Sequence, residues 1–174
     1  MWLNMNMDGV LFQWRIRGYR TGLAGKTGGW TRMDLRLQSK NVLNYQKIDD
    51  EQMTFGDVKD LHDTLESYLS GREIDIKELE SMERMFLFTF YPGEKVAMDV
   101  SMTVSIEFWI QGVSASLGLR FNRSEMKIML YYLRLVMGEI DEQDKTVKKL
   151  LEAGVFVRKR LRKIESASRQ DLFS

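Results

Sequence analysis

Apolar and polar residues alternate through the first fifty positions, as they do in strands that bury one face of a sheet. In residues 10–16 every even position is apolar, whereas positions 13 and 15 carry glutamine and arginine. Residues 31–37 follow the same rule, with charged side chains at 32, 34 and 36 opposite the apolar side. Residues 41–48 predict a third strand after a turn near position 40. We therefore expect three consecutive strands in this part of the chain.

The apolar spacing changes to that of an amphipathic helix after these strands. Its apolar stripe consists of Val58, Leu61, Leu65, Tyr68 and Leu69. Thr54 with Asp57 three residues later predicts a capping box, and Gly71 predicts a left-handed stop. The opposite face of this helix carries the carboxylates of Asp57, Asp60, Asp63 and Glu66.

The second half of the chain repeats this order of elements. Residues 85–91 are mostly apolar. In residues 98–110 every even position is apolar and most odd positions are polar, and apolar residues again take every second position in residues 113–121. Asn122 and Glu125 predict the cap of a second amphipathic helix, which Gly138 ends. A shift of 67 residues places Gly138 on Gly71 and aligns the apolar helix positions. Either a strand-strand-strand-helix unit was duplicated, or two unrelated amphipathic helices both end in glycine.

These elements predict an α+β fold in which a large, mostly antiparallel sheet carries two amphipathic helices on its apolar face. A chain of 174 residues can bury one sizeable core. After residue 140, apolar residues recur along one side of a segment rich in lysine and arginine. We expect an α+β domain in residues 1–140, and a basic C-terminal helix with a frayed end in residues 141–174.

The formal net charge of +1 hides an uneven distribution. Residues 1–144 contain 17 basic and 22 acidic side chains, whereas residues 145–174 contain 9 and 3. Between Asp49 and Arg84 there are 12 carboxylates and only 4 basic side chains. A surface of this sign attracts basic proteins and repels nucleic acid. The candidate partner-binding residues are therefore the four helix carboxylates, with the neighbouring Asp49, Asp50 and Glu51.

The sequence gives no positive sign of catalysis, of a cofactor or of a metal site. The chain has no cysteine, and its single histidine cannot assemble a zinc site of the histidine-rich kinds. His62 lies between Leu61 and Asp63, and no Gly-x-Ser-x-Gly elbow occurs. We interpret His62 as a surface or boundary residue, and we predict that the protein is not an enzyme.

The stretch GLAGKTGGW, residues 22–30, resembles a phosphate-binding loop. The P-loop spacing requires glycine where this chain has Arg20, and it requires a helix where the chain continues with Gly28 and Gly29. We therefore interpret residues 18–29 as a glycine-rich hairpin loop that binds no nucleotide.

The sequence also bears on the cell compartment and on the role of the basic segment. The first residues lack the basic and apolar regions of a signal peptide, and no apolar run approaches the roughly 20 residues of a membrane span, so we expect a cytoplasmic protein without membrane contact. The basic segment can dock on the body, contact a second copy in a homo-oligomer, or bind nucleic acid. We disfavour nucleic acid because the attached body is acidic. A ligand or catalytic pocket between sheet and helices, with Tyr131, Tyr132 and Arg134, is a further alternative.

The order of elements resembles the WapI-like family of small bacterial immunity proteins. The resemblance rests on the strand at 30–37, the helix VKDLHDTLESYLSG, the apolar strand at 86–91 and the alternating residues 100–110. It covers residues 9–140 and leaves the basic tail outside. It implies that the protein inactivates a cognate toxin, often a nuclease, by tight binding. An acidic surface suits that role because a nuclease attracts phosphates, and complementary charge speeds association.

The interpretation of the glycine-rich loop predicts that Lys26→Ala has little effect. The free energy of unfolding should change by less than about 0.5 kcal/mol, as for most exposed substitutions. Calorimetric titration of both proteins with ATP and GTP should show no binding. Saturable binding that the substitution abolishes would contradict this interpretation.

Overall fold

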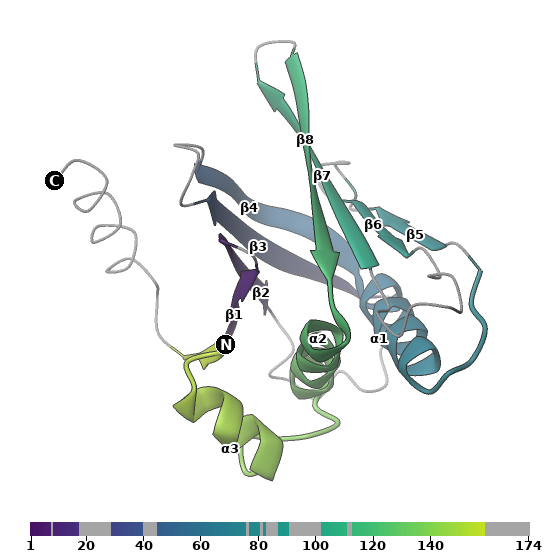
Figure 1. Cartoon of the computed structure of the whole chain (residues 1–174), viewed down its shortest axis with the longest axis vertical. Helices are drawn as coiled ribbons and strands as arrows, with labels where there is room; N and C mark the ends of the chain where they lie inside the picture. Colours follow the sequence, from purple (N-terminus) through teal and green to yellow (C-terminus); the bar gives the residue numbers. More distant parts are fainter. Residues whose placement is uncertain are drawn as a thin grey trace, which may run out of the picture.

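The computed structural model describes residues 1–7, 9–17, 29–39, 45–75, 77–80, 82, 87–90, 102–110 and 113–158. Figure 1 shows strands and helices arranged in the expected α+β class. In chain order the elements are β1 (Trp2–Met7), β2 (Val10–Arg17), β3 (Trp30–Ser39), β4 (Tyr45–Thr54), α1 (Phe55–Leu69), β5 (Lys77–Glu80), β6 (Leu87–Phe90), β7 (Met102–Ile110), β8 (Val113–Phe121), α2 (Arg123–Met137), α3 (Lys145–Glu152) and β9 (Phe156–Val157).

The strands form two antiparallel sheets. One sheet has the order β4-β3-β2-β1-β9 and the other has the order β5-β6-β7-β8. The single large sheet that the sequence suggested is thus divided in two, because α1 separates β4 from β5 and the later strands pair among themselves. A two-residue period identifies the buried side of each strand but not its neighbour in the sheet.

The predicted strands at 10–16 and 31–37 are confirmed as β2 and β3. Their register places Phe12 opposite Leu37 and Trp14 opposite Leu35, so the apolar positions share one face. The third strand starts at residue 45 and continues to residue 54, past its predicted end. Residues 41–44, the glycine-rich loop at 18–28 and residues 91–101 lie outside the described part of the chain. β1, β5 and β9 were not anticipated.

Both predicted helix starts are confirmed. Thr54 and Asp57 exchange two hydrogen bonds of 3.0 Å, and Asn122 and Glu125 exchange bonds of 2.8 and 3.0 Å. The glycines after the two helices take positive φ, as a left-handed stop requires. Four strands precede each helix, β1–β4 before α1 and β5–β8 before α2, rather than the three that we expected, and duplication as the origin of this repeat stays a prediction.

The core is centred on Tyr132 of α2, which is fully buried against the five-stranded sheet. Its hydroxyl accepts a hydrogen bond from the backbone N–H of Ile16 at 3.0 Å and donates one to the carbonyl of Met1 at 3.1 Å. Its ring packs on Trp14 and Phe156, with ring centroids 5.7 and 5.8 Å away. Burial raises the pKa of Tyr132, so its hydroxyl remains a donor at neutral pH.

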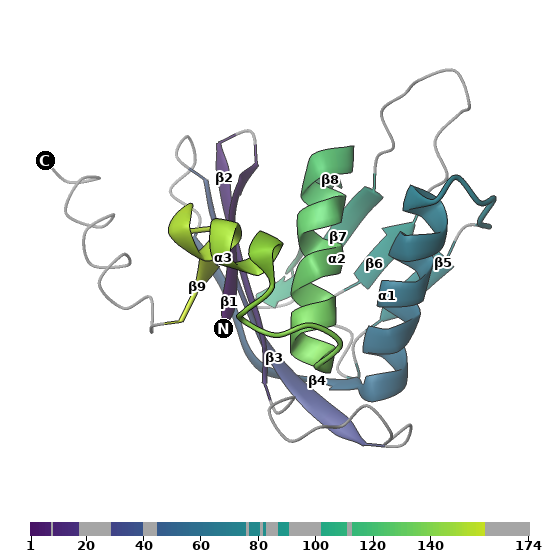
Figure 2. The ribbon, with the colours of Figure 1, turned by 90° about the horizontal axis from the view of Figure 1, so that it is seen from below.

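Aromatic contacts join the two sheets in one core. Phe12 of β2 meets Phe121 of β8, and Trp14 meets Phe88 of β6, each with ring centroids 5.5 Å apart. α1 lies alongside α2, as Figure 2 shows, and contributes buried leucines to the same core. The position of α1, and of the residues on its exposed side, therefore depends on how α2 sits on the sheets.

The C-terminal segment differs from the continuous basic helix that we expected. α3 contains only residues 145–152, and Gly154 with a φ of +71° ends it. Phe156 and Val157 then pair with Leu3 and Trp2 at the edge of the five-stranded sheet. The apolar spacing continues across Gly154, but glycine is a poor helix former and readily takes this left-handed conformation.

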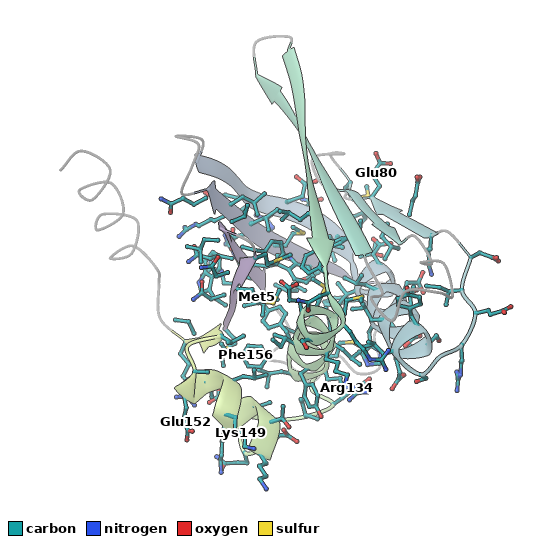
Figure 3. All side chains as sticks on the ribbon, viewed as in Figure 1. Met5, Glu80, Arg134, Lys149, Glu152 and Phe156 are labelled. Atoms are coloured by element: carbon teal, nitrogen blue, oxygen red, sulfur yellow. The ribbon has the colours of Figure 1, made fainter. Side chains whose placement is uncertain are left out.

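The short helix α3 packs through one side. Val147 is fully buried, whereas Lys149 and Glu152 are exposed and point away from the body in Figure 3. The basic residues from Lys159 onward lie outside the described residues. Docking of that tail, its use in a homo-oligomer and its binding to nucleic acid therefore stay predictions.

The outer face of the five-stranded sheet contains a buried carboxylate. Asp34 is 1% exposed and accepts hydrogen bonds from the side chains of Arg15 and Arg17 and from the backbone of Asp50. Burial alone raises the pKa of Asp34, but the hydrogen bonds from Arg17 and Arg15 outweigh burial and leave this pKa below its ordinary value. Asp34 is therefore ionised at neutral pH and holds β2 to β3.

Substitution of Asp34 by asparagine should lower the free energy of unfolding by about 2–4 kcal/mol at neutral pH, because two partly buried arginines lose their charged partner. Since the folded pKa lies below the unfolded value of about 3.9, the contribution of ionised Asp34 is present above that pH and is lost as the pH falls through the folded pKa. Denaturant unfolding between pH 7 and pH 2 should show the two proteins converging in acid. A difference that is independent of pH would contradict the assignment.

Tyr132→Phe should lower the free energy of unfolding by about 1–3 kcal/mol, because it leaves the buried N–H of Ile16 and the partly buried carbonyl of Met1 without this partner while keeping the ring. Tyr131→Phe is the matched control, since Tyr131 is only half-buried, and it should cost less than about 0.5 kcal/mol. Equal effects of the two substitutions in thermal and denaturant unfolding would show that the Tyr132 hydroxyl is not a structural link.

Candidate partner-binding site

The helix α1 has a buried side and a charged side. Val58, Leu61 and Leu65 are fully buried, whereas Asp60 and Glu66 are exposed. Asp63 lies between these extremes, with a side chain that is 48% exposed. A partner that approaches α1 would therefore meet three predicted site residues on one surface, and we call Asp60, Asp63 and Glu66 the α1 surface.

Asp57, the fourth predicted site residue, has a structural role at the start of α1. Its carboxylate accepts a hydrogen bond from the backbone N–H of Thr54, and its own N–H bonds to the Thr54 hydroxyl. This carboxylate satisfies a helix-terminal donor that would otherwise have no partner within the helix. A substitution of Asp57 would therefore change the stability of the helix as well as its charge.

Each carboxylate of the α1 surface has a basic partner. Asp63 pairs with Lys59 one turn earlier at 2.6 Å, and Asp60 lies 3.4 Å from Nζ of Lys77 in β5. Glu66 pairs at 2.8 Å with Arg134, which Figure 3 labels on α2. The face is therefore mixed in charge rather than purely acidic. Lys77 and Arg134 come from other elements, so the spacing along α1 could not reveal these two cations, whereas Lys59 lies one helical turn from Asp63 on α1 itself.

The carboxylate of Asp63 is held in its ionised form. Burial alone raises the pKa of Asp63, but hydrogen bonds from Lys59 and His62 outweigh burial and lower it. The same contact with Asp63 raises the pKa of Lys59. This ion pair is therefore fully charged at neutral pH.

A groove of about 360 Å³ opens beside the α1 surface, and its walls come from α1 and from the chain that leads into β5. Its lining residues are Asp63, Thr64, Ser67, Ile74, Asp75 and Lys77. Sequence reasoning missed this groove, because it treated residues 72–80 only as part of a negatively charged run. The sequence signal was the weak alternation of residues 77–80, which form the edge strand β5.

The alternative hypothesis of a pocket around Tyr131, Tyr132 and Arg134 is not supported by the positions of these side chains. Tyr132 is fully buried with both hydrogen bonds of its hydroxyl inside the core. Arg134 lies over the ring of Tyr131, with 5.6 Å from its guanidinium carbon to the ring centroid, and donates to Glu66. The side chains that sequence reasoning offered to a ligand thus fill the core or hold α1 to α2.

His62 is 4% exposed, so the interpretation of this residue as a surface or boundary histidine is wrong. Its Nδ1 lies 2.9 Å from Asp63 Oδ1, and its Nε2 lies 3.4 Å from Oε2 of Glu139, just after α2. The signal was available in the sequence, because positions 58, 61, 62 and 65 follow helical spacing and place His62 at the edge of the apolar stripe. Glu139 had no sequence signal.

Asp50 and Glu51, two of the predicted neighbouring carboxylates, do not join the α1 surface. Asp50 is exposed with a positive φ of 58°, and it pairs with Arg17 at 2.8 Å and with Arg32 at 3.9 Å on the sheet. Glu51 is 1% exposed, so it cannot offer its charge to a partner, contrary to our expectation. The reason is that β4 continues through this segment and turns Glu51 toward the interior.

The comparisons with known proteins bear on the region that contains this surface. Searches of the curated proteins and of the solved structures found no match. Among the described residues, no helix is both long and apolar enough to cross a membrane. The model of the immunity protein WapI-like family matches residues 3–141, a span that runs from β1 to just past α2 and includes all of α1. Because the match extends over most of the chain, this protein belongs to the WapI-like family of immunity proteins.

Proposed function

We propose that this protein neutralises a toxin by binding it through the α1 surface and the adjoining groove. The observation that carries the proposal is the family match across residues 3–141, combined with the exposed carboxylates of Asp60 and Glu66 and the half-exposed carboxylate of Asp63 within that span. We further propose that the toxin is basic and of the nuclease type, and that the protein binds it in the cytoplasm without catalysing a reaction.

The charge of the surface supports a basic partner. Five carboxylates belong to this region, those of Asp60, Asp63, Glu66, Asp75 and Glu139. Three cations, those of Lys59, Lys77 and Arg134, offset them and leave two net negative charges. A basic patch on a toxin would be attracted to this region at long range, which accelerates association more than it strengthens the complex.

The internal ion pairs are compatible with binding because they are weak. Exposed pairs of this kind contribute about 0–1 kcal/mol, so an arginine or lysine of the toxin can replace Lys59 or Arg134 at little cost. Until then the pairs restrict the carboxylates to a few conformations, which lowers the entropy lost on binding. The α1 surface thus offers preorganised acceptors for cations.

The groove adds a place where one long basic side chain of the toxin can insert. Ile74 supplies an apolar wall for the aliphatic stem, and Asp63 and Asp75 supply carboxylates for a guanidinium or ammonium group. Arginine anchors in such pockets are common hot spots of protein interfaces, because bidentate hydrogen bonds combine with stem burial. We propose that the toxin contributes an arginine here.

The test is a triple variant, Asp60→Asn with Asp63→Asn and Glu66→Gln, which removes charge and keeps shape. Asp57 stays unchanged because it caps the helix. Stability should fall by no more than about 1 kcal/mol for each of the three ion pairs lost, whereas the complex with the protein encoded by the adjacent gene should associate more slowly and weaken at least about tenfold. Surface plasmon resonance at low and high salt measures both effects.

The matched control removes three carboxylates away from α1, by Asp141→Asn, Glu142→Gln and Glu152→Gln. The dissociation constant of its complex should stay within about twofold of that of the unmodified protein, because charges away from the interface contribute little to affinity. Equal weakening in the two triple variants would show that only overall charge matters and would reject the α1 surface. A protein that never binds the adjacent toxin, in any form, would reject the proposed function itself.

A further inference from the structure

His62 presents a ring nitrogen in an unusual environment. The hydrogen bond of 2.9 Å between Nδ1 and the Asp63 carboxylate requires a proton on Nδ1, since a carboxylate can only accept. In the neutral ring, Nε2 then carries a lone pair. Nε2 is buried and without a hydrogen bond among the described residues, and it faces the Glu139 carboxylate at 3.4 Å. With the ring neutral, two electron-rich atoms thus face each other at a histidine side chain that is 5% exposed.

A cation between these two atoms would remove their repulsion. In a tetrahedral zinc site with bonds of about 2.0–2.1 Å, the ligand atoms lie about 3.3–3.4 Å from one another. The separation of Nε2 from Oε2 of Glu139 has this value. A carboxylate that accepts a hydrogen bond from the opposite ring nitrogen is also the usual support of a zinc-binding histidine, and Asp63 occupies that position.

A further carboxylate close to His62 comes from the same helix. Glu66 lies one helical turn after His62, and one ligand atom from each of His62, Asp63 and Glu66 can be chosen so that all lie within 4.8 Å of one another. Arg134 holds Oε1 of Glu66 at 2.8 Å, and the second oxygen of that carboxylate is the one that would bind. One imidazole and two carboxylates form a ligand set that suits zinc and similar ions better than magnesium or calcium.

We propose that His62 and Glu139 bind a divalent transition-metal ion such as zinc, with Asp63 orienting the histidine and Glu66 as a further carboxylate close to that histidine. Water would fill the remaining positions, because the two glutamates are about half-exposed and leave the site open on one side. The ligands come from α1 and from the turn after α2, so a bound ion connects the two elements that position the α1 surface. Lys59 and Arg134 reduce the negative charge of the site, so we expect an affinity in the micromolar range.

The experiment uses the full chain without a histidine tag, treated with a chelator and then titrated with zinc chloride. His62 is the only histidine, so its ring signals in an NMR spectrum need no further assignment. One equivalent of zinc should shift the ring nitrogen signals, with a dissociation constant below about 10 µM by calorimetry. Magnesium should leave them unchanged. Co²⁺ should give the visible absorption of a four-coordinate site.

Two variants distinguish a built site from unspecific binding to surface acids. Glu139→Gln changes an exposed side chain, so the fold is retained, and zinc binding should weaken at least about tenfold. Glu142→Gln, a nearby carboxylate that pairs with Arg158, is the matched control and should bind zinc as the unmodified protein does. Unchanged ring signals up to about 100 µM zinc, or equal affinity in His62→Gln and the unmodified protein, would overturn the proposal.

Discussion

The buried hydroxyl of Tyr132 needs hydrogen-bond partners inside the core. The two hydrogen bonds that it makes fix the position of α2, and the positions of the elements that pack on α2 follow from it. A buried hydroxyl without a partner costs several kcal/mol, so α2 has to lie where this oxygen reaches both the N–H of Ile16 and the carbonyl of Met1. In that position one hydroxyl links Met1 to Ile16 of β2, and the tyrosine ring packs on Phe156 of β9. α1 packs beside α2, so the orientation of its charged side is set by the same contact (Figure 2).

The local features of the fold could be predicted from sequence because they depend on residues close to one another in the chain. Both capping boxes and the apolar faces of β2 and β3 have periods or spacings of two to four residues. The division into two sheets could not be predicted, because it depends on pairings between distant strands. The same holds for β9, which forms because Gly154 turns the chain back and Phe156 fills a place beside Tyr132.

For the candidate site, too, the sequence could predict the local features but not the contacts between elements. Helical spacing placed Asp60, Asp63 and Glu66 on the exposed side of α1, but their basic partners Lys77 and Arg134 come from other elements. The burial of His62 follows helical spacing, whereas the carboxylate that faces its Nε2 comes from the turn after α2. Charge counts along the chain thus overestimated the acidity of the surface, since three-dimensional pairing neutralises part of it.

If a toxin binds on α1, a hydrogen-exchange footprint of the complex should show it most directly. Amide exchange of this protein alone and with the protein encoded by the adjacent gene should differ most in α1 and at Ile74, Asp75 and Lys77, which line the groove. The amides of β2 and β3 should exchange alike in both samples. Protection confined to β2, β3 or α3, with α1 unchanged, would contradict the account.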